Sequence, residues 1–171
     1  MYQLHCTKKL LDRIKPSAIA LDGATGTLLG NWYATALFWK PQVALLVNEK
    51  TLLPVLMPLA PATDLATRFP EQLAGVLVAH GMPQQFIDHE LAQMNEVQYA
   101  KTSNRSVVGI MNQFSYLTEG YRDYLETKDL LALSLRLSET PCSPLYKGAV
   151  SPDRELKQFV LSWQSKSTIR H

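Results

Sequence analysis

Aromatic and β-branched residues concentrate between positions 32 and 57 and predict three consecutive strands. Polar turn residues separate these strands, and short turns of this kind favour an antiparallel meander. Pro54 falls inside the third strand, which predicts an edge position or a bulge, because proline donates no backbone hydrogen bond. The predicted strands and turns alternate as 32–39, 40–42, 43–47, 48–50 and 51–57.

Apolar residues recur with helical spacing through much of the remaining chain and predict six helices. Several of these helices begin at a capping residue or a proline, such as Thr7, Asn104 and Pro152. Short runs at 2–6 and 96–101 predict two further strands. The predicted helices cover 8–14, 65–80, 83–94, 104–124, 128–138 and 152–163, and residues 164–171 are expected to form a frayed tail.

This order of elements predicts a single α+β domain over residues 1–171. The expected sheet is antiparallel and contains the three-stranded meander plus one or two further strands, with the helices packed on one face. The length of 171 residues suits one domain with a real core, and 46% hydrophobic against 19% charged residues is ordinary globular composition.

Charge and cysteine content narrow the expected partners and compartment. The net charge of +2 is too small to indicate nucleic acid by itself, although nucleic acid stays open as a less favoured partner. Cys6 and Cys142 make neither a disulfide framework nor a zinc pattern, which favours reduced thiols in a cytoplasmic protein. No apolar run reaches the length of a membrane span, so we expect no membrane association.

Two stretches begin like motifs of known binding or catalytic sites, but each lacks a residue that the motif requires. The glycine-rich stretch 22–27 lacks the Gly-Lys-Ser/Thr ending of a phosphate loop, because Gly30 is followed by Asn31. His89 and Glu90 begin like a zinc-protease motif, but Gln93 stands where the second histidine belongs. We therefore predict no metal site and no cofactor, and read the glycine-rich stretch as a structural loop.

The segment 101–106 is the strongest candidate for function. It joins a predicted strand to the start of a long predicted helix, where free backbone N–H groups and partial positive charge favour an anion. Lys101 and Arg105 would add two cations to such a site. The competing interpretation is structural, because Thr102 and Asn104 are also ordinary helix-capping residues.

Several segments together resemble an uncharacterised family of bacterial and archaeal proteins of unknown function. They are CTKKLL (6–11), GNWYA (30–34), VNEKTLLP (47–54), KTSNRSVVGIMN (101–112) and ETP (139–141). The resemblance implies a self-standing domain and brings no established activity. Members of that family often carry an acidic residue after the Met-Asn pair, whereas this chain has Gln113.

Polar and aromatic residues within these segments make up the candidate ligand-binding set. We expect some of them to line a basic groove, with a tryptophan as an aromatic wall. The candidate residues are Lys8, Trp32, Lys101, Thr102, Asn104, Arg105 and Asn112.

Three functions remain in competition at this stage. The first is a small bacterial binding or accessory module that takes an anionic small molecule at 101–106. The second is a protein-interaction component, either a homodimer or an accessory of a toxin–antitoxin system or mobile element. The third is a metal-independent enzyme built on the same cluster. Its acid or base would be Glu49 or Glu139, and it requires one of these carboxylates near Arg105.

Overall fold

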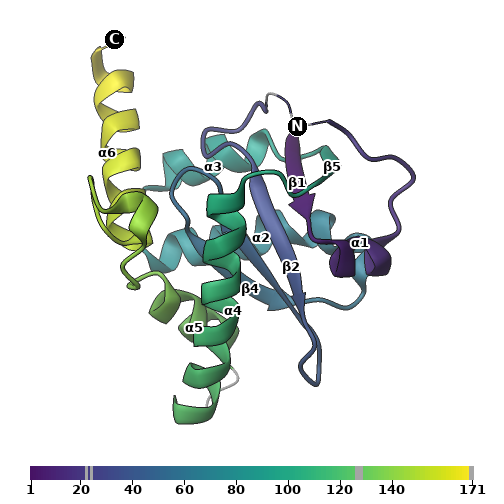
Figure 1. Ribbon diagram of the computed structural model, residues 1–171. Coiled ribbons are helices and arrows are strands. Elements are labelled where there is room, and N and C mark those ends of the chain that lie inside the picture. The colour runs from purple at the N-terminus through teal and green to yellow at the C-terminus, as the bar shows by residue number, and fades with distance from the viewer. Residues whose placement is uncertain (22, 24, 126–128, 170–171) are drawn as a thin grey trace.

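The computed structural model describes residues 1–21, 23, 25–125 and 129–169, and its arrangement is shown in Figure 1. Five strands and six α-helices are named in this part of the chain. Single-turn helices lie at Ala62–Asp64 and Ser143–Leu145. The strands are β1 (Tyr2–Cys6), β2 (Trp32–Leu37), β3 (Val43–Asn48), β4 (Pro54–Pro58) and β5 (Val97–Lys101), and the helices are α1 (Lys8–Ile14), α2 (Leu65–Ala79), α3 (Gln84–Ala92), α4 (Arg105–Leu125), α5 (Leu130–Leu137) and α6 (Pro152–Ile169).

The sheet has the strand order β4-β3-β2-β1-β5 and is mixed. The predicted meander is confirmed, because β2, β3 and β4 pair antiparallel, and Pro54 opens the edge strand β4. The prediction of a purely antiparallel sheet is wrong, because β1 pairs in parallel with both β2 and β5. Helices and loops occupy the long connections into β2 and β5, and parallel neighbours require crossovers of this length.

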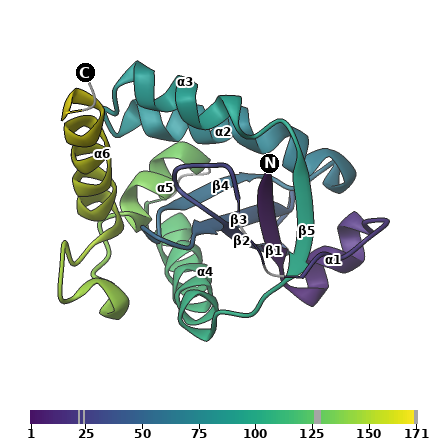
Figure 2. The same cartoon turned by 90° about the horizontal axis from the view of Figure 1, so that it is seen from above.

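Helices cover both faces of the sheet, so the prediction of helices on one face is also wrong. Trp32 of β2 lies in a first apolar core with α1, α2, α3 and α6, whereas Tyr33 lies in a second core with α4 and α5. Figure 2 shows α2 and α3 on one side of the strands and α4 on the other. Every residue of β2 and β3 is buried. Strands covered on both faces lose the apolar–polar alternation typical of one-sided sheets.

The helices form close to where their apolar spacing predicts. Asp129 caps α5 by accepting hydrogen bonds from the N–H groups of Leu131 and Ala132 at 3.1 and 3.2 Å, while the predicted start at Lys128 lies outside the described residues. α6 continues to Ile169, beyond the predicted end at 163, and Trp163 packs against Phe86 of α3. Within the described ranges, no helix combines the length and apolar character needed to cross a membrane.

Asn48, at the end of β3, fixes the end of the sheet where the parallel strands begin. Its side chain is fully buried, and its Oδ1 accepts hydrogen bonds from the N–H groups of Lys50 and Thr51 at 3.1 and 2.9 Å. Its Nδ2 donates to the carbonyl oxygens of Leu29 and Asn31 at 2.9 and 3.4 Å. One amide therefore joins the β3–β4 turn to the segment that leads into β2.

We expect Asn48→Ala to lower the free energy of unfolding by about 3 kcal/mol, because it strands buried donors and acceptors. Asn48→Asp should also be destabilised at neutral pH, since its carboxylate has no N–H for the two carbonyl oxygens. Urea unfolding measures both. The control is Asn112→Ala on the exposed side of α4, which should change stability by less than about 0.5 kcal/mol. Equal stability of Asn48→Ala and the control would contradict this role.

Candidate functional site

The carboxyl ends of β1 and β5 lie side by side, because Cys6 and Lys101 are partners in the parallel register. The segments that follow these two strands then diverge. α1 buries Leu10 and Ile14 in the first core, whereas α4 buries Val107 in the second. Figure 2 shows the loop that leaves β5 turning toward α4 and away from α1. We call residues 7–8 and 101–105 the strand-end junction.

Tyr33 holds the α4 side of the strand-end junction. Its hydroxyl accepts a hydrogen bond from the N–H of Asn104 at 3.0 Å and bonds the hydroxyl of Ser103 at 3.1 Å. Asn104 then caps α4, because its Oδ1 accepts from the N–H groups of Ser106 and Val107 at 3.0 and 3.3 Å. The predicted capping role of Asn104 is therefore confirmed, and it occupies two of the first amides of the helix.

Buried polar residues of β1 and β2 lie next to the strand-end junction. The ring of His5 stacks on that of Tyr33, with centroids 4.7 Å apart, and its Nδ1 lies 2.9 Å from the carbonyl oxygen of Lys101. The hydroxyl groups of Thr7 and Thr35 are hydrogen bonded at 2.9 Å. His5, Tyr33 and Thr35 are each less than 5% exposed, so these side chains are held in place by packing as well as by hydrogen bonds.

Three cations surround the strand-end junction, and all three side chains are exposed. Lys8 follows β1, Lys101 ends β5 and Arg105 opens α4. Within the described part of the chain, none of them pairs with a carboxylate. Since Asn104 already uses two of the α4 amides, a negatively charged ligand here would be met mainly by these side chains and by the positive end of α4.

The structure gathers only part of the predicted ligand-binding set at the strand-end junction. Lys8, Lys101, Thr102, Asn104 and Arg105 lie there, with Thr102 half-buried. Two residues of the set lie elsewhere.

Trp32 and Asn112 stand outside the strand-end junction. Trp32 begins β2, is fully buried and packs against Phe69 at 4.9 Å between ring centroids, so its ring belongs to the first core. Asn112 is exposed and lies about 10 Å further along α4 than Arg105. Neither residue therefore belongs to the strand-end junction.

The two candidate acid–base residues, Glu49 and Glu139, also lie away from the strand-end junction. Glu49 sits in the turn after Asn48, which pairs with the first residue of β2, at the opposite end of the parallel strands from Lys101. Glu139 follows α5, and its carboxylate lies 3.4 Å from the guanidinium of Arg136. The guanidinium of Arg136 lies over the ring of Tyr121, which is about 24 Å further along α4 than Arg105. Neither Glu49 nor Glu139 therefore lies near Arg105, as the enzyme hypothesis requires.

Thiols and metal ligands offer no further chemistry in the described residues. Cys6 and Cys142 are both buried, and burial raises the pKa of the Cys6 thiol to about 12 and that of the Cys142 thiol to about 11. Protonated thiols are poor nucleophiles at neutral pH. Among the same residues, no three His, Cys, Asp or Glu side chains gather closely enough to hold a metal ion.

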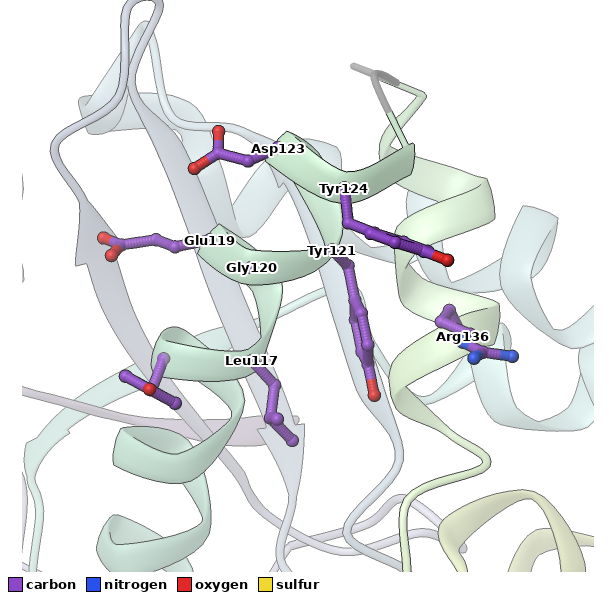
Figure 3. A pocket seen from close by; sticks show the side chains of 8 residues that line it. Leu117, Glu119, Gly120, Tyr121, Asp123, Tyr124 and Arg136 are labelled. Carbon is purple, nitrogen blue, oxygen red and sulfur yellow. The ribbon is translucent and has the colours of Figure 1, made fainter.

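A second surface feature is a groove of about 530 Å³ along the end of α4, which we call the tyrosine groove. Tyr116 and Tyr124 are 78% and 85% exposed on its walls. Figure 3 shows Tyr121 and Tyr124 directed toward the side of Arg136 on α5, while Glu119 and Asp123 project the other way. Acidic and basic side chains both line this groove. A groove of mixed charge is better suited to contact another protein than to bind a small anion.

Sequence reasoning assigned Tyr33, His5 and Glu90 no role in the fold or the site. Tyr33 could have been recognised from strand alternation, since it points to the face opposite Trp32. Glu90 follows Phe86 by four positions and Ile87 by three, so it lies on the buried face of α3. His5 left no signal of its own, because its neighbours come from β2 and β5.

Glu90 is a fully buried carboxylate that anchors the segment before β2. One oxygen accepts a hydrogen bond from the N–H of Leu28 at 2.8 Å, and both oxygens lie near the N–H of Leu29 at 3.3 and 3.4 Å. Burial raises the pKa of Glu90 to about 7, against the lowering effect of these two N–H groups and of Lys50. This carboxylate therefore titrates at physiological pH.

The raised pKa of Glu90 predicts stability that depends on pH. Between an unfolded pKa of 4.5 and a folded pKa of about 7, the folded state holds a proton that the unfolded state lacks, so the free energy of unfolding should fall as pH rises through this window. The predicted loss is about 3 kcal/mol. Urea unfolding from pH 4.5 to 8 measures it. Glu90→Gln, which does not titrate, should flatten this slope, and an unchanged slope in that variant would contradict the assignment.

Comparison with known proteins places this chain in a family. The sequence model of a domain of unknown function, DUF6933, matches residues 3–155, and this range contains the five strands, except Tyr2 of β1, and the whole strand-end junction. No curated protein and no solved structure matches the chain. The resemblance to an uncharacterised family is confirmed, while the bacterial or archaeal origin and the cytoplasmic location stay predictions. The chain belongs to the DUF6933 family of domains of unknown function.

Proposed function

We propose that this domain is a small binding module that takes an anionic small molecule, such as one bearing a phosphate group, at the strand-end junction. The observation that carries the proposal is the divergence of the chain after two adjacent parallel strands. β1 leads to α1 on one face of the sheet and β5 leads to α4 on the other. In open sheets with parallel strands, ligands bind outside the carboxyl ends at such a switch point.

The side chains around this point suit a negative ligand. Lys8, Lys101 and Arg105 come from three different elements and carry three positive charges without a paired carboxylate in the described ranges. Arg105 offers a forked donor for two anionic oxygens, and the lysines act as point charges. The hydroxyl of Ser103, fixed by Tyr33, adds a neutral donor at the same place.

The other hypotheses have less support. Nucleic acid binding calls for an extended basic stripe, whereas this chain has a net charge of only +2 and three exposed cations at the strand-end junction. An enzyme at this site would need a base other than Glu49 or Glu139. A protein-interaction component is the second candidate, and the observation in its favour is the exposure of Tyr116 and Tyr124 on the tyrosine groove.

Thermal unfolding with pyrophosphate at low ionic strength tests the proposal. Saturation at about 100 times the dissociation constant should raise the melting temperature by about 5–10 °C. Arg105→Gln and Lys101→Gln should each weaken binding about tenfold, because each removes a charged hydrogen bond. Added salt should weaken binding by screening.

The matched control is Lys147→Gln, which removes an exposed lysine from the turn before α6. Pyrophosphate should raise the melting temperature of this variant as much as that of the unmodified chain. If Arg105→Gln and Lys101→Gln also keep the full shift, the anion acts elsewhere or through general salt effects, and the proposal is wrong.

A further inference from the structure

A cavity of about 560 Å³ lies on a different part of the molecule, between α3 and α6, and we call it the α3–α6 cavity. Its walls come from the segment before β2, the β3–β4 turn, α3 and one face of α6. A volume of this size falls in the range of small-molecule sites. The lining residues are Leu28, Lys50, His89, Phe159, Ser162, Trp163, Lys166 and Ser167.

The packing of α6 explains why this wall is aromatic. Leu156 and Val160 anchor α6 in the first core, so the neighbouring stripe of the helix faces α3. On that stripe, Phe159 and Trp163 meet the ring of Phe86 edge-on, with centroids 6.3 and 5.3 Å apart. Both aromatic side chains remain partly exposed toward the cavity. A flat apolar ligand would therefore find two ring surfaces held by the core.

Lys50 brings a positioned cation to the same cavity. Its Nζ donates a hydrogen bond to the carbonyl oxygen of Leu28 at 3.1 Å and lies 5.8 Å from the centroid of the Phe159 ring. Its stem crosses Gly30, where a Cβ would approach the Lys50 Cε at 3.0 Å. An ammonium group has three donors, so two stay available for a ligand.

The ionisable side chains that line the α3–α6 cavity are all basic. Lys50 and Lys166 line it, together with the imidazole of His89, which meets Trp163 edge-on at 5.9 Å. No lining residue is acidic. Behind this lining, the buried carboxylate of Glu90 accepts hydrogen bonds from the N–H groups of Leu28 and Leu29 and lies close enough to Lys50 for this ammonium group to lower its pKa. The site therefore attracts negative charge beside its aromatic rings.

We propose that the α3–α6 cavity binds a small aromatic anion, with the ring of the ligand against Phe159 and Trp163 and its carboxylate or phosphate on Lys50 and Lys166. This site does not depend on the strand-end junction, because the β3–β4 turn that carries Lys50 lies at the opposite end of the parallel strands. The matched family range ends at residue 155, so the aromatic wall lies beyond it.

Calorimetric titration of the full chain with 4-hydroxybenzoate and with phenyl phosphate tests this proposal. Both probes should bind with millimolar or tighter dissociation constants, and the tighter one identifies the preferred anionic group. Lys50→Met keeps the apolar stem over Gly30 and should weaken binding about tenfold, because it removes the ammonium donors. Lys166→Met, on the exposed part of α6, should weaken binding in the same direction and serves as a second variant.

Three controls make the result decisive. Lys157→Met changes an exposed lysine of α6 that does not line the cavity and should bind as the unmodified chain does. All titrations, including that with inorganic phosphate, are run in the Arg105→Gln background, which weakens the proposed anion site of the strand-end junction and leaves the lining of the α3–α6 cavity unchanged, so that the measured binding reports the cavity. Inorganic phosphate should bind more weakly than phenyl phosphate. The proposal is overturned if neither aromatic probe binds, if inorganic phosphate binds as well, or if both Lys50→Met and Lys166→Met bind as the unmodified chain does.

Discussion

The parallel pairing of β1 with both of its neighbours determines how the rest of this chain is arranged. All five residues of β1 are buried, and β2 and β5 flank it on its two edges. Each parallel neighbour forces the chain to cross the sheet and return, and these crossovers supply α1, α2 and α3. The same pairing brings the ends of β1 and β5 together at Cys6 and Lys101. The strand-end junction is therefore a direct consequence of the sheet topology.

The two faces of the sheet are chemically different at this point. On the first face β1 presents Leu4 and Cys6 to the apolar core, whereas on the second face it presents Gln3 and His5. Gln3 donates hydrogen bonds to the carbonyl oxygen of Leu21 at 3.0 Å and to Gln98 at 3.2 Å, and His5 stacks on Tyr33. Buried polar groups with partners of this kind hold a local structure rigidly. His5 and Tyr33 therefore hold the backbone at Lys101 and Asn104 in a fixed position, through the carbonyl oxygen of the first and the N–H of the second.

Local patterns in the sequence predicted the elements well and their assembly poorly. The meander, the edge position of Pro54 and the cap at Asn104 follow from residues close together in the chain. The parallel pairing of β1 with β5 joins segments more than 90 residues apart and leaves no local signature. In the candidate site the cations were predictable as exposed charges beside a cap. Trp32 was misplaced because an aromatic residue at a strand start suits a core as well as a binding wall, and Tyr33 was overlooked beside it.

Backbone amide NMR can locate the bound anion and so test the proposed binding at the strand-end junction. In a pyrophosphate titration the amides of residues 7–8 and 101–107 should show the largest chemical-shift changes, with Tyr33 next because its hydroxyl bonds Asn104. Changes confined to the tyrosine groove, to the α3–α6 cavity or to no residues at all would contradict the account.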